Sequence, residues 1–108
     1  MLQHSEIKQR FSRIERDISE AAETCRSDPK LPQNLRDCVK QLEQQTQQAK
    51  PILESQDEKQ IARCVDDLEA TGGRAELALK GMSNVDSKLS NAVVHAHSEL
   101  SELKMKLH

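Results

Sequence analysis

The chain has 108 residues, of which 35% are hydrophobic and 31% charged, and its formal net charge is −2. This length suits one domain over residues 1–108. Phe11 is the only aromatic residue, and there are three glycines and three prolines. That composition favours helices over a β-sandwich or barrel, which would need more turn residues and more β-branched or aromatic runs. The shortage of aromatic residues also argues against a deep ligand pocket.

The charge pattern argues against two kinds of partner. Basic and acidic residues alternate along the chain without a basic block, so we expect no nucleic-acid binding. No apolar run approaches the roughly 18 residues of a membrane span, and the first residues lack the layout of a signal peptide. Three cysteines, an odd number, suit a reducing compartment. We therefore expect a cytoplasmic protein that does not bind membranes.

The first helix is predicted over residues 5–27. Its apolar residues recur in steps of three and four, which places them on one stripe of a helix: Ile7, Phe11, Ile14, Ile18, Ala21, Ala22 and Cys25. Two prolines, Pro29 and Pro32, then end the helical pattern. Pro32 suits the first position of the next helix, because a proline there loses no hydrogen bond.

The second helix is predicted over residues 32–54, but Pro51 allows two positions for its C-terminal end. Either the helix stops near Ala49 or Lys50, or it continues with a kink to Glu54. Ser55 and Glu58 have the spacing of a capping box, which indicates a new helix start. The alternative is one long bent helix from residue 32 to 82, which would give a three-helix bundle.

The third helix is predicted over residues 56–81. Its apolar or small residues again recur in steps of three and four: Ile61, Val65, Leu68, Gly72, Ala75, Leu79 and Met82. Because this spacing is kept through Gly72 and Gly73, the helix is expected to run through both glycines with Gly72 buried. Gly81 is a plausible C-terminal stop, and Ser83 and Asp86 can cap a fourth helix over residues 84–107. Small residues of that helix, Ala92 and Ala96, lie level with Gly72, so helices three and four should approach closely there.

Four helices with short connections must pack against antiparallel neighbours. The predicted fold is therefore all-α, an antiparallel up-down-up-down four-helix bundle.

Residues that could carry chemistry are few. Cys25, Cys38 and Cys64 form no Cys-x-x-Cys pair, and a buried cysteine usually packs as a small hydrophobe. His95 and His97 are two residues apart, so a helix points them to different sides, and we expect surface histidines rather than metal ligands. No acid, base and nucleophile fall together. The sequence thus predicts no enzyme, no catalytic residue, no cofactor and no metal site.

Some apolar residues lie off the four stripes and are the best candidates for a binding surface. Leu77 and Val94 lie beside the core lines, and Ile52 and Met105 are placed with them. Exposed together, they would form a patch for another protein or for a second copy of the chain; alternatively, helix packing covers them. We therefore predict a non-enzymatic helical interaction module, an adaptor, regulator or accessory subunit able to self-associate. The alternative function is a small-molecule or metal sensor that uses Cys25, Cys38 or a terminal histidine.

Overall fold

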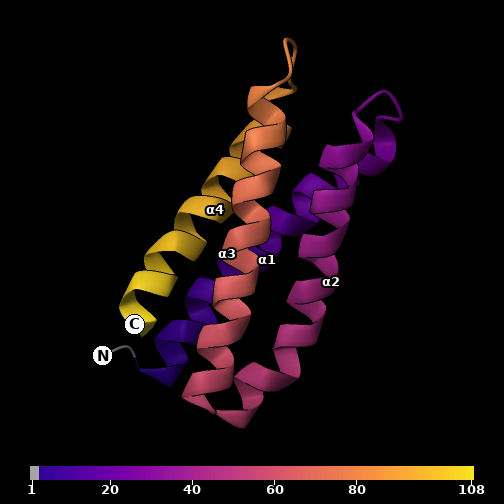
Figure 1. Ribbon diagram of the computed structural model, residues 1–108. Coiled ribbons are helices and arrows are strands. Elements are labelled where there is room, and N and C mark those ends of the chain that lie inside the picture. The colour runs from indigo at the N-terminus through magenta and orange to yellow at the C-terminus, as the bar shows by residue number, and fades with distance from the viewer. Residues whose placement is uncertain (1–2) are drawn as a thin grey trace.

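The computed structural model describes residues 3–108, which form four α-helices and no strand (Figure 1). The helices are α1 (His4–Ser27), α2 (Gln33–Ser55), α3 (Glu58–Lys80) and α4 (Ser87–Leu107). The prediction of an all-α four-helix fold is confirmed. The three-helix alternative is wrong, because α2 and α3 are separate helices joined by a tight turn.

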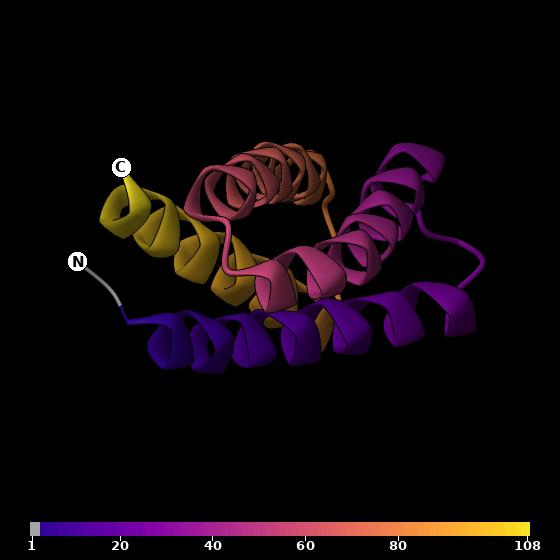
Figure 2. The ribbon, with the colours of Figure 1, turned by 90° about the horizontal axis from the view of Figure 1, so that it is seen from below.

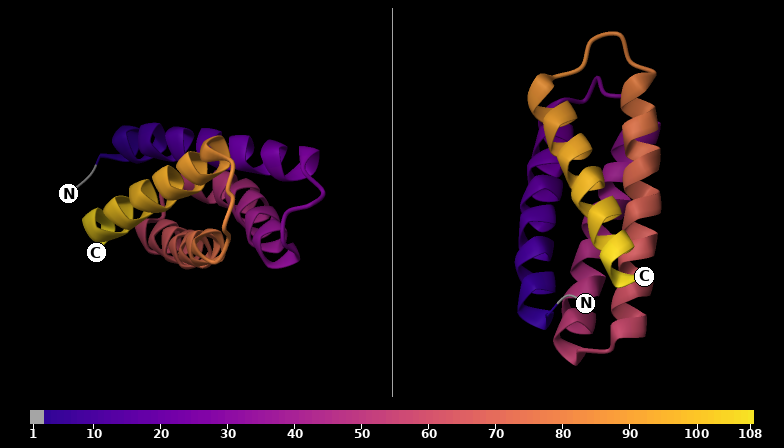
Figure 3. Two further views of the ribbon diagram at one scale, coloured as in Figure 1. Left: turned by 90° about the horizontal axis from the view of Figure 1, so that it is seen from above. Right: turned by 90° about the vertical axis from the view of Figure 1, so that its left-hand side faces the viewer.

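The helices form a closed square in which each packs against two neighbours, in the order α1, α2, α3, α4 and back to α1. Viewed from below, α1 and α3 lie on opposite sides with α2 and α4 between them (Figure 2). The α1–α2 and α3–α4 loops lie at one end, and the start of α1 and the end of α4 lie at the other (Figure 3). The bundle measures 40 × 21 × 18 Å.

One apolar stripe from each helix supplies the core. The largest side chains are almost completely buried, and they come from all four helices: Ile14, Ile18, Leu35, Leu42, Ile61, Leu68, Leu89, Leu100 and Leu103. Two threonines are also buried, and each satisfies its hydroxyl within its own helix. Thr46 donates to the carbonyl of Leu42 and Thr71 to that of Asp67. The core therefore buries these polar groups without leaving a hydroxyl unpaired.

Pro51 lies inside α2, so the interpretation in which the helix continues past it is the correct one. The helix ends at Ser55, and the next residue, Gln56, has the left-handed conformation (φ 61°). Its backbone N–H donates to the carbonyl of Leu53. A left-handed residue is a common way to end a helix, although glycine usually fills the position.

The predicted capping boxes are wrong, and an aspartate caps each of the two helices instead. Ser55 belongs to α2, and its hydroxyl donates to the carbonyl of Ile52. The N-cap of α3 is Asp57, whose carboxylate accepts from the backbone N–H groups of Lys59 and Gln60. Asp86 caps α4 in the same way through Lys88. Both later helices consequently begin two or three residues beyond the predicted positions.

Candidate interaction face on α3 and α4

Three large apolar side chains point into solvent from α3 and α4. The exposed fractions are 68% for Leu77, 44% for Val94 and 77% for Met105. Ile52 does not join them, because it is half-buried and packs against the core. The surface formed by the other three residues is therefore confined to two neighbouring helices.

Ion pairs between α3 and α4 fix how the two helices are aligned. Glu76 pairs with His97 at 3.2 Å, and Glu69 pairs with Lys104 at 3.2 Å. Because the helices are antiparallel, these pairs place Leu77 at about the height of Val94. Met105 lies about 17 Å further along α4, at 1.5 Å per residue.

Along each helix, the neighbours of these apolar side chains in the same outward-facing row are small and uncharged. They continue the outward-facing rows of the two helices in steps of three and four: Ala70 and Gly73 on α3, and Ser98 and Ser101 on α4. We call the whole set the outer face, defined by Ala70, Gly73, Leu77, Val94, Ser98, Ser101 and Met105. The two rows do not meet, because His97, Glu69, Glu76 and Lys104 lie between them at the contact of α3 and α4. The small side chains therefore leave room for another helix along each row, and not across the whole outer face.

His97 fills the space that the two glycines of α3 leave open. A Cβ atom added to Gly72 would lie 3.4–3.6 Å from atoms of His97, and one added to Gly73 would lie 3.4 Å from its Nε2 atom. The imidazole thus rests over the diglycine at the contact between α3 and α4. Gly72 is buried, as are Ala92 and Ala96, but the neighbour that Gly72 meets is a histidine.

Both ring nitrogens of His97 face carboxylates of α3. Nε2 lies 2.8 Å from Glu69 and Nδ1 lies 3.2 Å from Glu76. A hydrogen bond at each nitrogen at the same time requires the doubly protonated ring, since a neutral imidazole carries one N–H. The hydrogen bond from His97 holds the pKa of Glu69 below its usual value, with Lys104 contributing in the same direction and burial opposing both. The expectation of a surface histidine is wrong for His97, whose side chain is only 22% exposed.

The other two histidines of α4 also bridge to neighbouring helices. His95 bonds through Nδ1 to Asp17 of α1, and its Nε2 lies 3.7 Å from Glu99 of its own helix. His108 lies 2.9 Å from Asp66 of α3. Carboxylates therefore occupy nitrogens of all three α4 histidines, and His97 in particular has no ring nitrogen free to act on a substrate.

The cysteines lie apart from the outer face. Cys25 is buried, Cys38 and Cys64 are half-buried, and all three are free thiols. Burial raises the pKa of both the Cys25 and the Cys64 thiol, which lowers the fraction of reactive thiolate. Across residues 3–108, no group of three or more His, Cys, Asp or Glu side chains is arranged to hold a metal ion.

Sequence reasoning did not find the pairing of His97 with Glu69 and Glu76. The available signal was the diglycine itself: two glycines inside a helix of constant phase leave room for a bulky neighbour. Identifying that neighbour requires the alignment of α3 against α4, which the apolar stripes specify only to within about one turn.

Comparison of the chain with protein-family models, with curated proteins and with solved structures finds no match in any of the three. None of the helices in the described part of the chain is long and apolar enough to cross a membrane. Because a four-helix bundle serves many unrelated functions, the surface and its chemistry have to carry any functional conclusion.

Proposed function

We propose that this protein is a non-enzymatic interaction module that binds an amphipathic helix of another protein along its outer face. The exposure of Leu77, Val94 and Met105 is the observation that carries the proposal. Contiguous apolar side chains in solvent mark contact surfaces more often than scattered ones do, and Leu77 and Val94 lie at about the same height on neighbouring helices. A partner helix would place its own apolar stripe along the α4 row that joins Val94 to Met105 through Ser98 and Ser101, with Leu77 at the edge of the contact.

The size of the outer face favours a single helix over a second copy of the chain. It extends for about three helical turns, or about 17 Å. Even two helices wide, it offers a few hundred Å², which is less than the roughly 800 Å² per partner of a standard stable interface. The proposed contact is therefore short and transient, which suits an adaptor or a regulator better than a permanent dimer.

A photo-crosslinking residue in place of Met105, in the full chain within its own host, tests the proposal. We expect a covalent adduct with a foreign protein, and the crosslinked peptide should be an amphipathic helix. The double change Leu77→Glu with Val94→Glu should abolish the adduct while circular dichroism shows unchanged helicity. The same reporter at Arg16, an exposed position on α1, should give no such adduct.

Three results would contradict the proposal. They are the absence of any adduct at Met105, an adduct that survives the double change, and an adduct of equal yield from Arg16. An adduct of twice 12.2 kDa would identify a second copy of the chain as the occupant, and would replace the foreign helix by self-association.

A further inference from the structure

The interface between α1 and α2 is the least closely packed of the four, and three cavities lie along it. The two larger ones lie at opposite ends. One, of about 350 Å³, lies beside the α1–α2 loop, and we call it the loop-end cavity. The other, of about 440 Å³, lies beside Pro51, and we call it the far-end cavity. Both have the volume of a small-ligand site.

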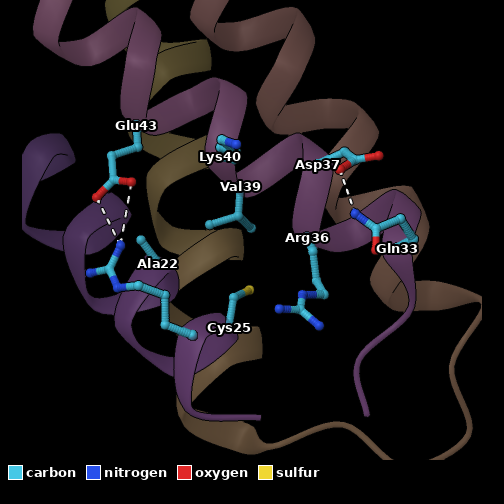
Figure 4. A pocket seen from close by; sticks show the side chains of 9 residues that line it. Ala22, Cys25, Gln33, Arg36, Asp37, Val39, Lys40 and Glu43 are labelled. Atoms are coloured by element: carbon cyan, nitrogen blue, oxygen red, sulfur yellow. Dashed lines mark hydrogen bonds and ion pairs between the residues drawn. The ribbon is translucent and has the colours of Figure 1, made fainter. Parts of the chain in front are cut away.

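The loop-end cavity has an apolar floor and a charged rim. Ala22, Cys25 and Val39 form the floor, and all three are buried. Arg26, Arg36, Lys40 and Glu43 stand around them, with the thiol of Cys25 facing toward the Arg36 side chain (Figure 4). The cavity therefore places basic groups around a floor whose three residues are only 1–6% exposed, so the apolar surface of the floor is small.

Two of its basic groups have no carboxylate partner. Arg26 pairs with Glu43 at 3.4 Å. Arg36 donates only to the backbone carbonyl of Pro29, at 3.3 Å, and no ion pair of Lys40 occurs among residues 3–108. Arg36 and Lys40 are one turn apart on α2, where like charges repel each other.

The remaining acid of the rim does not neutralise this pair. Asp37 accepts a 2.8 Å hydrogen bond from Gln33 of its own helix. Figure 4 shows that these two side chains lie to one side, away from the floor at Cys25. Asp37 thus forms no ion pair with Arg36 or Lys40. The lining holds three basic residues and two acidic ones, which leaves an excess of one positive charge.

The far-end cavity provides an internal contrast, because its basic groups are paired. Lys8 lies 2.8 Å from Glu54, and Lys50 lies 3.2 Å from Glu15. Both pairs bridge α1 and α2 beside a cavity of similar volume. An excess of positive charge therefore distinguishes the loop-end cavity.

The influences on the pKa of the Cys25 thiol also indicate a positive electrostatic potential at the cavity floor. Burial is the largest influence and raises its pKa, but Arg36 and Arg26 act in the opposite direction and outweigh Asp28. The charges around the floor thus favour a negative charge at that point, while desolvation disfavours an uncompensated one.

We propose that the loop-end cavity binds a small amphipathic anion, a carboxylate or phosphate monoester with a short apolar chain. Its head group would lie between Arg36 and Lys40, relieving their repulsion through charge-assisted hydrogen bonds. Its short apolar chain would lie over the small exposed parts of Ala22, Cys25 and Val39 and against the aliphatic stems of the surrounding basic side chains. This ligand site is separate from the outer face, since it lies between α1 and α2.

Titration calorimetry of the full chain with hexanoate and with hexyl phosphate tests the proposal, and the pair distinguishes the two head groups. We expect saturable one-to-one binding of at least one of them, with NMR shifts concentrated on the methyl groups of Ala22 and Val39. The variant Arg36→Gln with Lys40→Gln should weaken binding at least about tenfold.

A matched variant, Arg16→Gln with Lys88→Gln, removes the same charge from exposed positions elsewhere and should leave the affinity unchanged. The single change Lys40→Gln, at an exposed position, guards against loss of folding in the double variant.

The proposal is overturned if neither anion binds, if hexanol or hexylamine binds as tightly as hexanoate, or if the matched variant weakens binding equally. Inorganic phosphate binding as tightly as hexyl phosphate would overturn the role of the apolar floor. Each of these results is independent of the crosslinking result at Met105.

Discussion

At the scale of single residues, the contact between Gly72 and His97 determines how closely α3 and α4 approach. Glycine inside a helix costs about 1 kcal/mol relative to alanine. Here the missing side chain leaves space for an imidazole that also bonds two carboxylates of α3. The local cost of the glycine is therefore offset by packing and hydrogen bonding across the two helices.

Substitutions at Gly72 test this account. A Cβ atom would lie 3.4 Å from His97, within ordinary van der Waals contact, so Gly72→Ala should be neutral or stabilising by about 0.5 kcal/mol. Gly72→Leu would push its larger side chain into His97 and should lower the free energy of unfolding by about 1–3 kcal/mol. Urea unfolding measures both changes. A leucine variant as stable as the alanine variant would show that His97 does not limit the space.

Glu69 should make stability depend on acid pH. Its pKa is lower in the folded protein, mainly because His97 bonds to it, so the carboxylate stabilises the fold above its unfolded pKa. That contribution is lost as the pH falls through the folded pKa. Glu69→Gln should thus cost about 1 kcal/mol near neutral pH and almost nothing once the pH is well below the folded pKa of Glu69. Urea unfolding of both proteins across this range measures the difference, and a constant gap would contradict the assignment.

At the scale of helices, the turn between α2 and α3 shows which residues define helix ends. Ser55 and Asp57 are both suitable caps by residue type, and the spacing of Ser55 to Glu58 favoured the serine. The structure assigns the cap to Asp57, because α2 continues through Pro51 and takes in Ser55. How far one helix extends thus decides where the next one begins.

Alanine substitutions separate the two caps. Asp57→Ala removes the acceptor for the N–H groups of Lys59 and Gln60 and should cost about 1 kcal/mol. Ser55→Ala removes two exposed bonds, one that its hydroxyl donates to the carbonyl of Ile52 and one that it accepts from the N–H of Asp57. Because both bonds lie at the exposed helix end and neither involves an N–H of α3, the change should alter stability by less than about 0.5 kcal/mol. Thermal unfolding of the two variants gives the comparison. Equal losses would mean that the serine takes part in the cap.

At the scale of the whole molecule, the apolar stripes were sufficient to predict four helices and their antiparallel packing. Each stripe shows which face of its helix is buried. Four helices that bury one face each against a shared core, and that are joined by short loops, can pack in only a few ways. They carry no information on polar contacts between helices, such as those of His97 with Glu69 and Glu76. Those contacts depend on alignment to within an ångström. The cations around Cys25 were missed for the same reason, because only the packed α1–α2 interface shows which charges lack a partner.

Leu77 and Leu79 offer a direct test of how the molecule divides its apolar residues between core and surface. They lie two positions apart on α3, and Leu79 is 5% exposed while Leu77 is 68% exposed. Leu79→Ala opens a cavity in the core and should cost about 2–5 kcal/mol. Leu77→Ala should change stability by no more than about 0.5 kcal/mol, since it loses almost no buried contact. Chemical unfolding of the two variants measures both effects. If Leu77→Ala were as costly as Leu79→Ala, Leu77 would serve the fold and the outer face would lose its main anchor. If it is neutral, Leu77 does not serve the fold, and its side chain stays available for the contact proposed on the outer face.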